Sequence, residues 1–465
     1  MKKILAIVLS LVLLAAFAAC GETGENSSEN PQTPSDPTTP VDPPEITVPD
    51  GNYVLALAED VLSLIEGDTG IEIGIATFTR DGADADHAYL SYASSDPDVV
   101  AIEEGKINAV GGGTATVTVS CKNASDTLTV NVLGVANGDE ILTEKGVKTY
   151  GRVYENSDGL VIDNVNSGVA FAFYGTEFKM KIYNSSGTVQ YIRYYLDGDE
   201  EGTRVPIGLP VERTYTFASG LEEGEHTIRI LKATEQRYGN TTYSFTVMQV
   251  FTGENCRILE RATETDDVLK IDFYGDSITA GQGNLSANSS DAITVGNSDG
   301  TQTYAAFAAQ ELGAEGSFVG YGGITVKAPH FYGSEITMYS IWHWYSTLHR
   351  VDYPVDPDTD FVVINLGTND SNVSNYSTEQ FTADYLSMLN EMKISYPNAH
   401  FVLCYGMMGR AYGIDSGITA VVEQFDGEAS YCKLPSNLEG AGSHPTVEGH
   451  RAAGKYLAQF IEGLI

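Results

Sequence analysis

The chain of 465 residues is poor in basic side chains: 26 Lys and Arg stand against 63 Asp and Glu, a formal net charge of −37. This charge repels phosphate groups, so the sequence excludes an unassisted nucleic-acid partner and disfavours adsorption to anionic lipid headgroups. Cysteine is also scarce, with 5 residues. Neither the cysteines nor the 8 histidines show the spacing of zinc ligands, and we expect no metal and no other cofactor.

Residues 4–14 form an apolar run that is too short to span a membrane as a helix. The run follows two lysines and precedes small residues, which indicates a signal peptide over residues 1–19. Phe17-Ala-Ala-Cys20 resembles a bacterial lipoprotein box, with Phe17 an imperfect match at its first position. We therefore expect a lipid on Cys20 and an extracellular, cell-surface location on a bacterium. This lipid would be the protein's one attachment to a membrane. Ordinary secretion with cleavage nearby is the alternative.

Residues 20–45 form the predicted linker, because they hold few bulky apolar side chains and repeated prolines, which favour extended polyproline conformations. At about 3.1 Å per residue, such a segment reaches up to roughly 80 Å from its anchor. This length suits a spacer on a cell surface.

Residues 46–133 alternate apolar and polar side chains in short runs between turn residues, which predicts an all-β sandwich. The predicted strands are 53–57, 61–65, 71–78, 99–102, 106–110 and 114–119. The segments Ser94–Ile102, Gly105–Val110 and Gly113–Val117 resemble bacterial Ig-like domains of group 2. Nothing catalytic occurs here, so a spacer is favoured over an adhesion module.

Residues 134–258 form a second β-rich stretch, which we interpret as a jelly-roll-like β-sandwich. Its predicted strands are 169–173, 178–182, 191–196 and 243–250, and a clean alternation runs from Gly224 to Glu235. His226 falls on this alternation and is predicted to be structural.

Residues 259–465 contain two runs that are typical of buried strands, and each run is followed by small and polar residues. Val268–Tyr274 leads through a glycine to Ser277. Asp360–Leu366 leads through a glycine to Asn369. Parallel sheets carry their sites at the carboxyl ends of strands. The pattern therefore predicts that the Ser277 hydroxyl and the Asn369 amide share one sheet edge.

Three further features belong to the same region. Residues 303–312 read as a helix, and 316–326 as a strand followed by a glycine-rich turn. His444 stands just before Pro445, a residue favoured at the first position of a helix. We expect a closing helix over Pro445–Ile465, with His444 on the loop that enters it. Gly275 is expected to allow a sharp turn and to leave room for a substrate above Ser277.

Gly275–Thr279, Gly367–Asp370 and His444–Pro445, in this order, resemble the SGNH (GDSL-type) hydrolase superfamily. The resemblance implies an α/β/α three-layer domain with a parallel sheet. In the preceding stretch, Gly151-Arg-Val, Phe173–Thr176 and the Gly-Glu-His-Thr run at 224–227 resemble the N-terminal domain of carbohydrate esterase family 2. The order of the two domains is more specific than either alone.

The chemistry of ester hydrolysis assigns the roles within this resemblance. A serine hydroxyl needs an adjacent imidazole to take its proton, so Ser277 is the predicted nucleophile and His444 the general base, then acid. The backbone N–H groups of Ser277 and Gly323 and the amide of Asn369 would hold the oxyanion. Gly322 is a close alternative to Gly323, and a plain tight turn is a further reading of these glycines.

The superfamily usually places an acid three residues before the histidine, and here that residue is Ala441. Family 2 includes members that work as a Ser-His dyad, with a backbone carbonyl orienting the imidazole. We therefore expect a Ser277/His444 dyad, with Glu439 as the fallback acid. His450 is predicted to be structural, and Asp276 and Asp370 are expected to anchor loops.

Two groups of side chains allow two interpretations each. The aromatic cluster Trp342–Tyr345 could stack on sugar rings or pack in the core. Cys404 and Cys432 could form a disulfide in an exported protein, although Cys404 fits a buried thiol equally well.

The resemblance implies an esterase that removes O-acetyl groups from polysaccharides of the acetylxylan or acetylmannan type. The partner would be an acetylated polysaccharide or oligosaccharide, and the sequence does not indicate an oligomeric state. Two alternatives are an SGNH esterase or lipase acting on other acyl substrates, and a carbohydrate-binding or adhesion protein with a degenerate hydrolase domain.

Overall fold

The computed structural model describes residues 47–136, 147–209, 211–251, 257–259, 268–330, 332–409 and 411–465. The predicted signal peptide, Cys20 and most of the linker lie outside these residues. The chain divides into two compact units, residues 1–49 and 50–465, and all the elements below belong to the second. No helix of the described residues is long and apolar enough to cross a membrane.

The first β-rich region consists of short, mostly antiparallel strands. They are β1 Tyr53–Leu57, β2 Val61–Ile65, β3 Ile71–Glu72, β4 Ile75–Arg80, β5 Ala83–Asp84, β6 Ser91–Ser94, β7 Val100–Glu103, β8 Lys106–Ala109, β9 Gly113–Cys121 and β10 Ala124–Ala136, with a 3-10 turn at His87–Tyr89. Alternate side chains enter a dry core that includes Val100, Ile107, Val117, Val119 and Val130. The predicted β-rich character is confirmed, while the Ig-like assignment stays a prediction.

One predicted strand of this region is wrong. Residues 71–78 form two strands, because each half pairs with a different partner: β3 with β8, and β4 with β1. The break falls at Gly74, whose carbonyl accepts the N–H of Ala58 at 2.9 Å.

Strand β10 runs through the predicted domain boundary between residues 133 and 134. Up to Val132 it pairs with β9, and over Gly134–Ala136 it pairs with β18 of the next region. The two β-rich regions therefore share one continuous sheet.

The second region is a sandwich of two antiparallel sheets. Its strands are β11 Val147–Tyr150, β12 Val153–Asn156, β13 Gly159–Ile162, β14 Gly168–Gly175, β15 Phe178–Asn184, β16 Gln190–Leu196, β17 Thr203–Ile207, β18 Glu212–Ala218, β19 Gly224–Lys232, β20 Arg237–Tyr238, β21 Thr241–Thr242, β22 Phe245–Phe251 and β23 Arg257–Ile258. The strand orders are β12-β13-β22-β15-β18 and β11-β14-β19-β16-β17. Apolar side chains from both sheets form one core, for example Phe171 and Ile230 against Met180 and Phe245. The predicted sandwich is confirmed, and its jelly-roll topology stays a prediction.

The C-terminal region is an α/β domain around a parallel sheet of order β25-β24-β26-β27-β28. Its strands are β24 Ile271–Gly275, β25 Phe318–Gly320, β26 Phe361–Asn365, β27 His400–Tyr405 and β28 Ala429–Lys433. Its helices are α1 Tyr304–Leu312, α2 Met338–Ile341, α3 Thr378–Ser395, α4 Tyr412–Gln424 and α5 Val447–Glu462, with 3-10 turns at Asp370–Asn372 and Ala441–Ser443.

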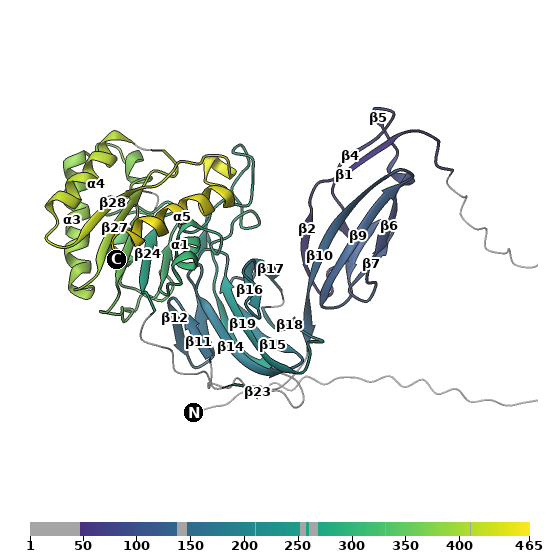
Figure 1. Ribbon diagram of the computed structural model, residues 1–465, viewed down its shortest axis with the longest axis horizontal. Coiled ribbons are helices and arrows are strands. Elements are labelled where there is room, and N and C mark those ends of the chain that lie inside the picture. The colour runs from purple at the N-terminus through teal and green to yellow at the C-terminus, as the bar shows by residue number, and fades with distance from the viewer. Residues whose placement is uncertain are drawn as a thin grey trace, which may run out of the picture. The chain divides into compact units, whose positions relative to one another are not determined.

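Helices cover both faces of this sheet, so its inner strands β24, β26 and β27 are buried along nearly their whole length and are mostly apolar. Helices α1 and α5 pack on one face, where Phe273 and Val363 meet Leu457. Helices α3 and α4 pack on the other, where Ile364 meets Leu389 (Figure 1). The predicted three-layer arrangement is present.

Helix α5 begins two residues later than the sequence predicts. Thr446 is its N-cap, and the threonine hydroxyl accepts the N–H of Gly449 at 3.2 Å. A threonine oxygen satisfies a free N–H of the first turn, which proline cannot do. Pro445 therefore stands before the cap, and His444 lies on the preceding loop as predicted.

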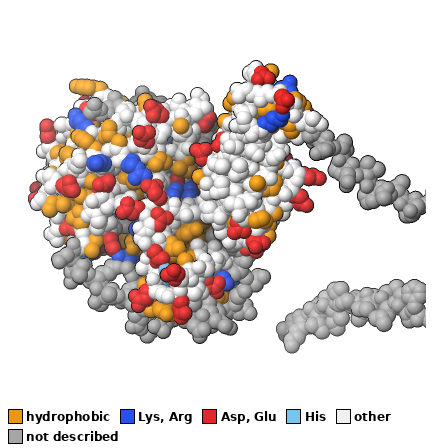
Figure 2. All heavy atoms as spheres, turned by 45° about the vertical axis from the view of Figure 1, so that its right-hand side comes forward, with side chains coloured by type: hydrophobic (Ala, Val, Ile, Leu, Met, Phe, Trp, Pro, Cys, Tyr) orange, Lys and Arg blue, Asp and Glu red, His pale blue; other side chains and the backbone are white. Residues whose placement is uncertain are grey.

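Acidic side chains are spread over the visible face of the molecule, and basic ones are fewer there (Figure 2). Some of the scarce basic residues are buried instead, including Arg152 and Lys232. The surface therefore keeps the strongly negative character that the composition indicates.

Arg152, between β11 and β12, inserts its guanidinium into the α/β domain and is about 1% exposed. It donates to the carbonyls of Trp342 at 2.6 Å and Trp344 at 2.5 Å, and to the Tyr274 hydroxyl at 2.6 Å. Through Tyr396, the Tyr274 hydroxyl connects to the carboxylate of Asp272. A buried cation is thus matched by acceptors from the neighbouring domain, which fixes the sandwich on the α/β domain.

We expect Arg152→Ala to lower the free energy of unfolding by roughly 3–5 kcal/mol, because it leaves several buried acceptors unpaired. Urea unfolding followed by fluorescence measures this. Lys455→Ala, which removes an exposed cation from α5, should change the stability by no more than about 0.5 kcal/mol. Equal stability of the two variants would contradict this role of Arg152.

Candidate active site

Three neighbouring strands of the parallel sheet end at the same level. Gly275 at the end of β24 is paired with Gly320 of β25 and with Asn365 of β26. The loops that carry Ser277, Gly323 and Asn369 therefore leave one edge of the sheet, as the sequence predicts.

Ser277 and His444, which lie 167 residues apart in the chain, are in direct contact. The distance between Ser277 Oγ and His444 Nε2 is 2.8 Å, and both side chains are buried. This is the spacing of a hydrogen bond from a hydroxyl to an imidazole nitrogen. The structure thus brings the two predicted catalytic residues together.

The loop before His444 is held in an unusual backbone conformation. Ser443 has φ = 60°, in the left-handed region that non-glycine residues seldom occupy. Backbone hydrogen bonds fix the loop on the segment that follows Ser277: Ala441 N–H donates to the Gly283 carbonyl, and Gly442 N–H to the Asp291 carbonyl, both at 3.0 Å. The position of the imidazole is therefore set by main-chain contacts.

The imidazole of His444 has no acidic partner among the described residues. Burial lowers its pKa below 6.5, whereas the carbonyls of Gly442 and Ala441 act in the opposite direction. No described group meets Nδ1 with full hydrogen-bond geometry. Because Nε2 faces the serine hydroxyl, the neutral ring carries its proton on Nδ1, on the side of these carbonyls.

Glu439, the fallback acid, is exposed, and its hydrogen bonds are local. Its carboxylate accepts from the Asn437 amide at 3.3 Å, and its own N–H donates to Asn437. Nothing in the described structure links it to His444.

The hydrogen bonds of the loop after β25 distinguish between Gly322 and Gly323 as the candidate donor to the oxyanion. Gly322 N–H donates to the carboxylate of Glu235 at 3.2 Å. The N–H groups of Gly323 and Ser277 donate to no other described residue. Gly323 also has φ = 78°, so it serves a tight turn as well. Gly323, rather than Gly322, therefore has an N–H available for a ligand.

The side chain of Asn369 joins the other two loops. Its amide nitrogen donates to the Ile324 carbonyl at 2.9 Å and to the Asp276 carboxylate at 3.3 Å. These acceptors are the immediate neighbours of Gly323 and Ser277. Asn369 therefore lies where the prediction requires, with its amide hydrogens engaged within the protein.

Asp276 and Asp370 anchor loops, as predicted. The Asp276 carboxylate accepts the N–H of Ile278 at 2.9 Å, and that of Asp370 accepts the N–H of Val326 at 3.0 Å. Burial raises the pKa of each to about 7.

Gly275 is needed for close packing. A Cβ at this position would lie 2.0 Å from Thr279 Oγ1. The predicted room for a substrate above Ser277 stays a prediction.

The structure also settles the roles of two histidines. His450 is fully buried, its Nδ1 accepts the N–H of Tyr304 at 3.0 Å, and burial lowers its pKa to about 3. His226 contacts Asp197 and the Glu222 carbonyl within the sandwich. Both act structurally, as predicted.

Among the remaining predictions, Trp342 belongs to the hydrophobic core and Trp344 packs against it, which favours the packing interpretation of that aromatic cluster. Cys404 and Cys432 lie opposite each other on β27 and β28 as free, buried thiols.

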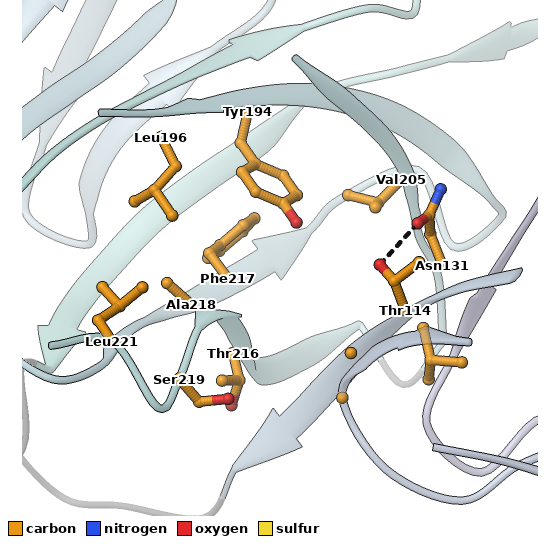
Figure 3. Close-up of a pocket in the computed structure, with 13 residues that line it drawn as sticks. Thr114, Asn131, Tyr194, Leu196, Val205, Thr216, Phe217, Ala218, Ser219 and Leu221 are labelled. Atoms are coloured by element: carbon orange, nitrogen blue, oxygen red, sulfur yellow. Dashed lines mark hydrogen bonds between the residues drawn. The ribbon is translucent and has the colours of Figure 1, made fainter. Parts of the chain in front are cut away.

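Other parts of the described structure offer less chemistry. A pocket of about 190 Å³ lies where β9 and β10 meet β16 to β18 (Figure 3). Its lining includes Tyr194, Leu196, Val205 and Phe217 and a hydrogen bond between Thr114 and Asn131. It contains no predicted site residue and no titratable group that could act near neutral pH. No cluster of His, Cys, Asp or Glu within the described ranges has the arrangement of a metal site.

Sequence analysis missed Glu235, which joins the sandwich to the Gly322 loop. Glu235 comes at the end of an alternating run, and the residues around it do not indicate a contact with Gly322, which is 87 residues away in the sequence. Nothing in the sequence marks it out from an exposed carboxylate.

Two family profiles match the chain in succession. The profile described as "Carbohydrate esterase 2 N-terminal" matches residues 149–255, and "GDSL-like Lipase/Acylhydrolase family" matches residues 273–452. In these matches the chain resembles carbohydrate esterase family 2, with the N-terminal domain of that family followed by a GDSL-like hydrolase domain. The matches show a carboxylic ester hydrolase, and they confirm the predicted order of these two domains.

Similar proteins agree with this family. The cellulase/esterase CelE of Acetivibrio thermocellus is 28% identical over 313 residues, which are 64% of this chain but 36% of that protein, so the chain spans about a third of its relative. A family 2 carbohydrate esterase from Clostridium thermocellum, solved with cellohexaose, is 25% identical with a TM-score of 0.62, covering 69% of this chain and 99% of that one.

An acetyl xylan esterase from the rumen bacterium Butyrivibrio proteoclasticus shares the fold. Its TM-score is 0.61 at 19% identity, covering 72% of this chain and 99% of that one.

The lowered pKa of His444 gives a prediction for the pH dependence of ester hydrolysis. A protonated imidazole cannot accept the serine proton, so kcat/KM should fall as the pH drops through the His444 pKa. Because that pKa lies below 6.5, the midpoint of the acid limb should lie below pH 6.5. Initial rates on a chromogenic acetate between pH 4.5 and about 8 measure it, and a midpoint above 6.5 would contradict the assignment.

Proposed function

We propose that the protein is a cell-surface serine esterase that removes O-acetyl groups from polysaccharides through a Ser277/His444 dyad. The observation that carries this proposal is the 2.8 Å contact between Ser277 Oγ and His444 Nε2 at the carboxyl edge of the sheet. The two family-profile matches support the reaction type, and the geometry supports the assignment of roles.

In the first half of the reaction, Ser277 Oγ attacks the acetyl carbonyl carbon while its proton passes to His444 Nε2. The tetrahedral intermediate collapses, the bond to the sugar oxygen breaks, and that oxygen takes the proton from Nε2. In the second half, a water gives a proton to Nε2 and attacks the carbonyl carbon of the acetyl-serine. The bond to Ser277 Oγ then breaks, Oγ takes the proton from Nε2, and acetate leaves.

The dyad needs a substitute for the missing acid. The carbonyls of Gly442 and Ala441 raise the pKa of the His444 ring, and they favour the tautomer with hydrogen on Nδ1. They would also stabilise the imidazolium that forms during the reaction. A carbonyl provides less charge than a carboxylate, and it avoids burying an unpaired anion when the enzyme is at rest.

The N–H groups of Ser277 and Gly323 are the proposed main-chain donors to the oxyanion, since no other described residue accepts from them. Asn369 would add its amide by exchanging the longer of its two contacts, the 3.3 Å bond to Asp276, for the substrate oxygen. Donors that are fixed before the reaction stabilise developing charge without reorganising.

An acetylated plant-type polysaccharide is the proposed substrate class. Relatives of the chain include an acetyl xylan esterase and an esterase solved with cellohexaose. An acetyl group requires space for only a methyl, and a neutral sugar chain is not repelled by a protein with net charge −37. The predicted lipid on Cys20 would place the enzyme at the surface of a bacterial cell.

The deciding experiment compares the wild-type protein with Ser277→Ala on a chromogenic acetate and on acetylated xylan, with release of acetate as the readout. We expect hydrolysis of both by the wild type and loss of nearly all of it in Ser277→Ala. Glu439→Ala should keep its activity, since a dyad needs no acid. Loss of activity in a folded Glu439→Ala would replace the dyad by a triad.

The same assay separates the alternatives. A wild type that hydrolyses long-chain acyl esters but not acetylated xylan would indicate another acyl substrate. A wild type without hydrolysis that still binds the polysaccharide would indicate a binding protein.

We expect Asn369→Ala to lower kcat by about 100- to 1,000-fold while the protein stays folded, because one donor to the oxyanion is lost. The matched control is Asn372→Ala, on the same loop, whose exposed amide donates to the Thr368 carbonyl at 3.1 Å. Its kcat should stay within about twofold of wild type. Equal turnover of the two variants would remove Asn369 from the oxyanion site.

A further inference from the structure

A carboxylate from the β-sandwich reaches into the α/β domain beside the proposed active site. Glu235 follows β19 and is buried. Its Oε1 accepts from the Gln282 amide at 2.5 Å, and its Oε2 accepts from Gly322 N–H at 3.2 Å. One side chain of the preceding domain thus ties together two segments of the hydrolase domain.

These two segments carry the proposed main-chain donors to the oxyanion. Gly322 directly precedes Gly323, and its N–H bond to Glu235 fixes the peptide plane next to the Gly323 N–H. Gln282 donates its backbone N–H to the Ser277 carbonyl at 3.0 Å, so it is coupled to the turn that presents Ser277. Glu235 is therefore connected to both segments that carry the proposed main-chain donors.

The fit around this carboxylate is tight. A Cβ added to Gly322 would lie 2.2 Å from Gln282 Nε2 and 3.2 Å from Glu235 Oε2. Only glycine allows the loop to approach both partners. The loop, the glutamine and the glutamate therefore form one closely packed unit.

The buried carboxyl of Glu235 is held by hydrogen bonds within the protein. Burial raises its pKa to about 7, while Gln282, Gly322 and Lys232 act to lower it. Burial likewise lowers the pKa of the nearby Lys232 to about 7, and Lys232 Nζ donates to the carbonyls of Thr234 and Glu235. Such a buried, hydrogen-bonded group is costly to rearrange and so holds its neighbours in place.

We propose that Glu235 is a positioning residue of the oxyanion site, supplied to the hydrolase domain by the preceding sandwich. This inference rests on the proposed function. The sandwich of residues 134–258 would then contribute to the chemical step, because its Glu235 places the N–H groups of Gly323 and Ser277.

The test compares Glu235→Ala with Gln236→Ala on a chromogenic acetate, with kcat, KM and the unfolding midpoint measured for each. Gln236 is the matched control because it is also buried and also crosses to the hydrolase domain, but its amide accepts from Thr347. We expect Glu235→Ala to lower kcat by about 10- to 100-fold, less than the loss of a donor, with KM within about threefold. Gln236→Ala should lose similar stability and keep kcat within about threefold.

The kcat of the conservative variant Glu235→Gln separates a positioning role from a purely structural one. In Glu235→Gln the side-chain oxygen can still accept from Gly322, so this variant should recover most of the lost kcat. Equal kcat for Glu235→Ala and Gln236→Ala, or no recovery in Glu235→Gln, would overturn the inference. Should the alanine variants not fold, Glu235→Asp, whose shorter side chain cannot reach both Gln282 and Gly322, is compared with Gln236→Asn, which is shortened in the same way. A kcat for Glu235→Asp at least about threefold below that of Gln236→Asn, at unchanged KM, then supports the inference, and equal values overturn it.

The outcome is separable from that of the proposed function. A wild type that does not hydrolyse acetates refutes the esterase assignment itself. A wild type that hydrolyses them while Glu235→Ala matches Gln236→Ala refutes only the role of Glu235.

Discussion

The proposed active site depends on the level at which three parallel strands end. Since Gly275 is paired with Gly320 on one side and with Asn365 on the other, short loops are enough to gather Ser277, Gly323 and Asn369. The histidine is placed by a different means. Its loop comes from far along the chain, and main-chain bonds to Gly283 and Asp291 hold it over the serine. Sheet register thus positions the nucleophile and the proposed oxyanion donors, and loop packing positions the base.

The electrostatics of the site follow from burial of the His444 imidazole, which has no acidic partner among the described residues. Desolvation keeps the His444 imidazole neutral and able to accept a proton, and the surrounding carbonyls bias its tautomer. A buried carboxylate beside the ring would strengthen the base, but it would need its own compensation. The buried acids close to the site, Asp276 and Asp370, are used instead to hold loops. The protein therefore separates the groups that organise the backbone from the groups that move protons.

Local patterns were sufficient for much of the fold. The strands Tyr53–Leu57 and Val61–Ile65 were predicted with their observed bounds, because side-chain alternation is a local property. The run at 71–78 divides in two since strand partners are set by distant chain segments. The motif order gave Ser277, His444 and Asn369, yet it left Gly322 and Gly323 undecided. The contact between Glu235 and Gly322 decides between these two glycines, and Arg152 holds the sandwich and the α/β domain together. Glutamate and arginine side chains are usually exposed, so no local signal shows that these two are buried.

The buried contacts of Arg152 have a consequence for how such proteins change over generations. A sandwich carrying arginine and a hydrolase domain carrying the matching carbonyls and tyrosines are each incomplete when separated, because the separation leaves unsatisfied polar groups in an apolar surface. Exchange of one half for an unrelated module would leave the Arg152 guanidinium or its acceptors buried without partners, at a cost in stability. This cost favours the inheritance of the two halves as a pair.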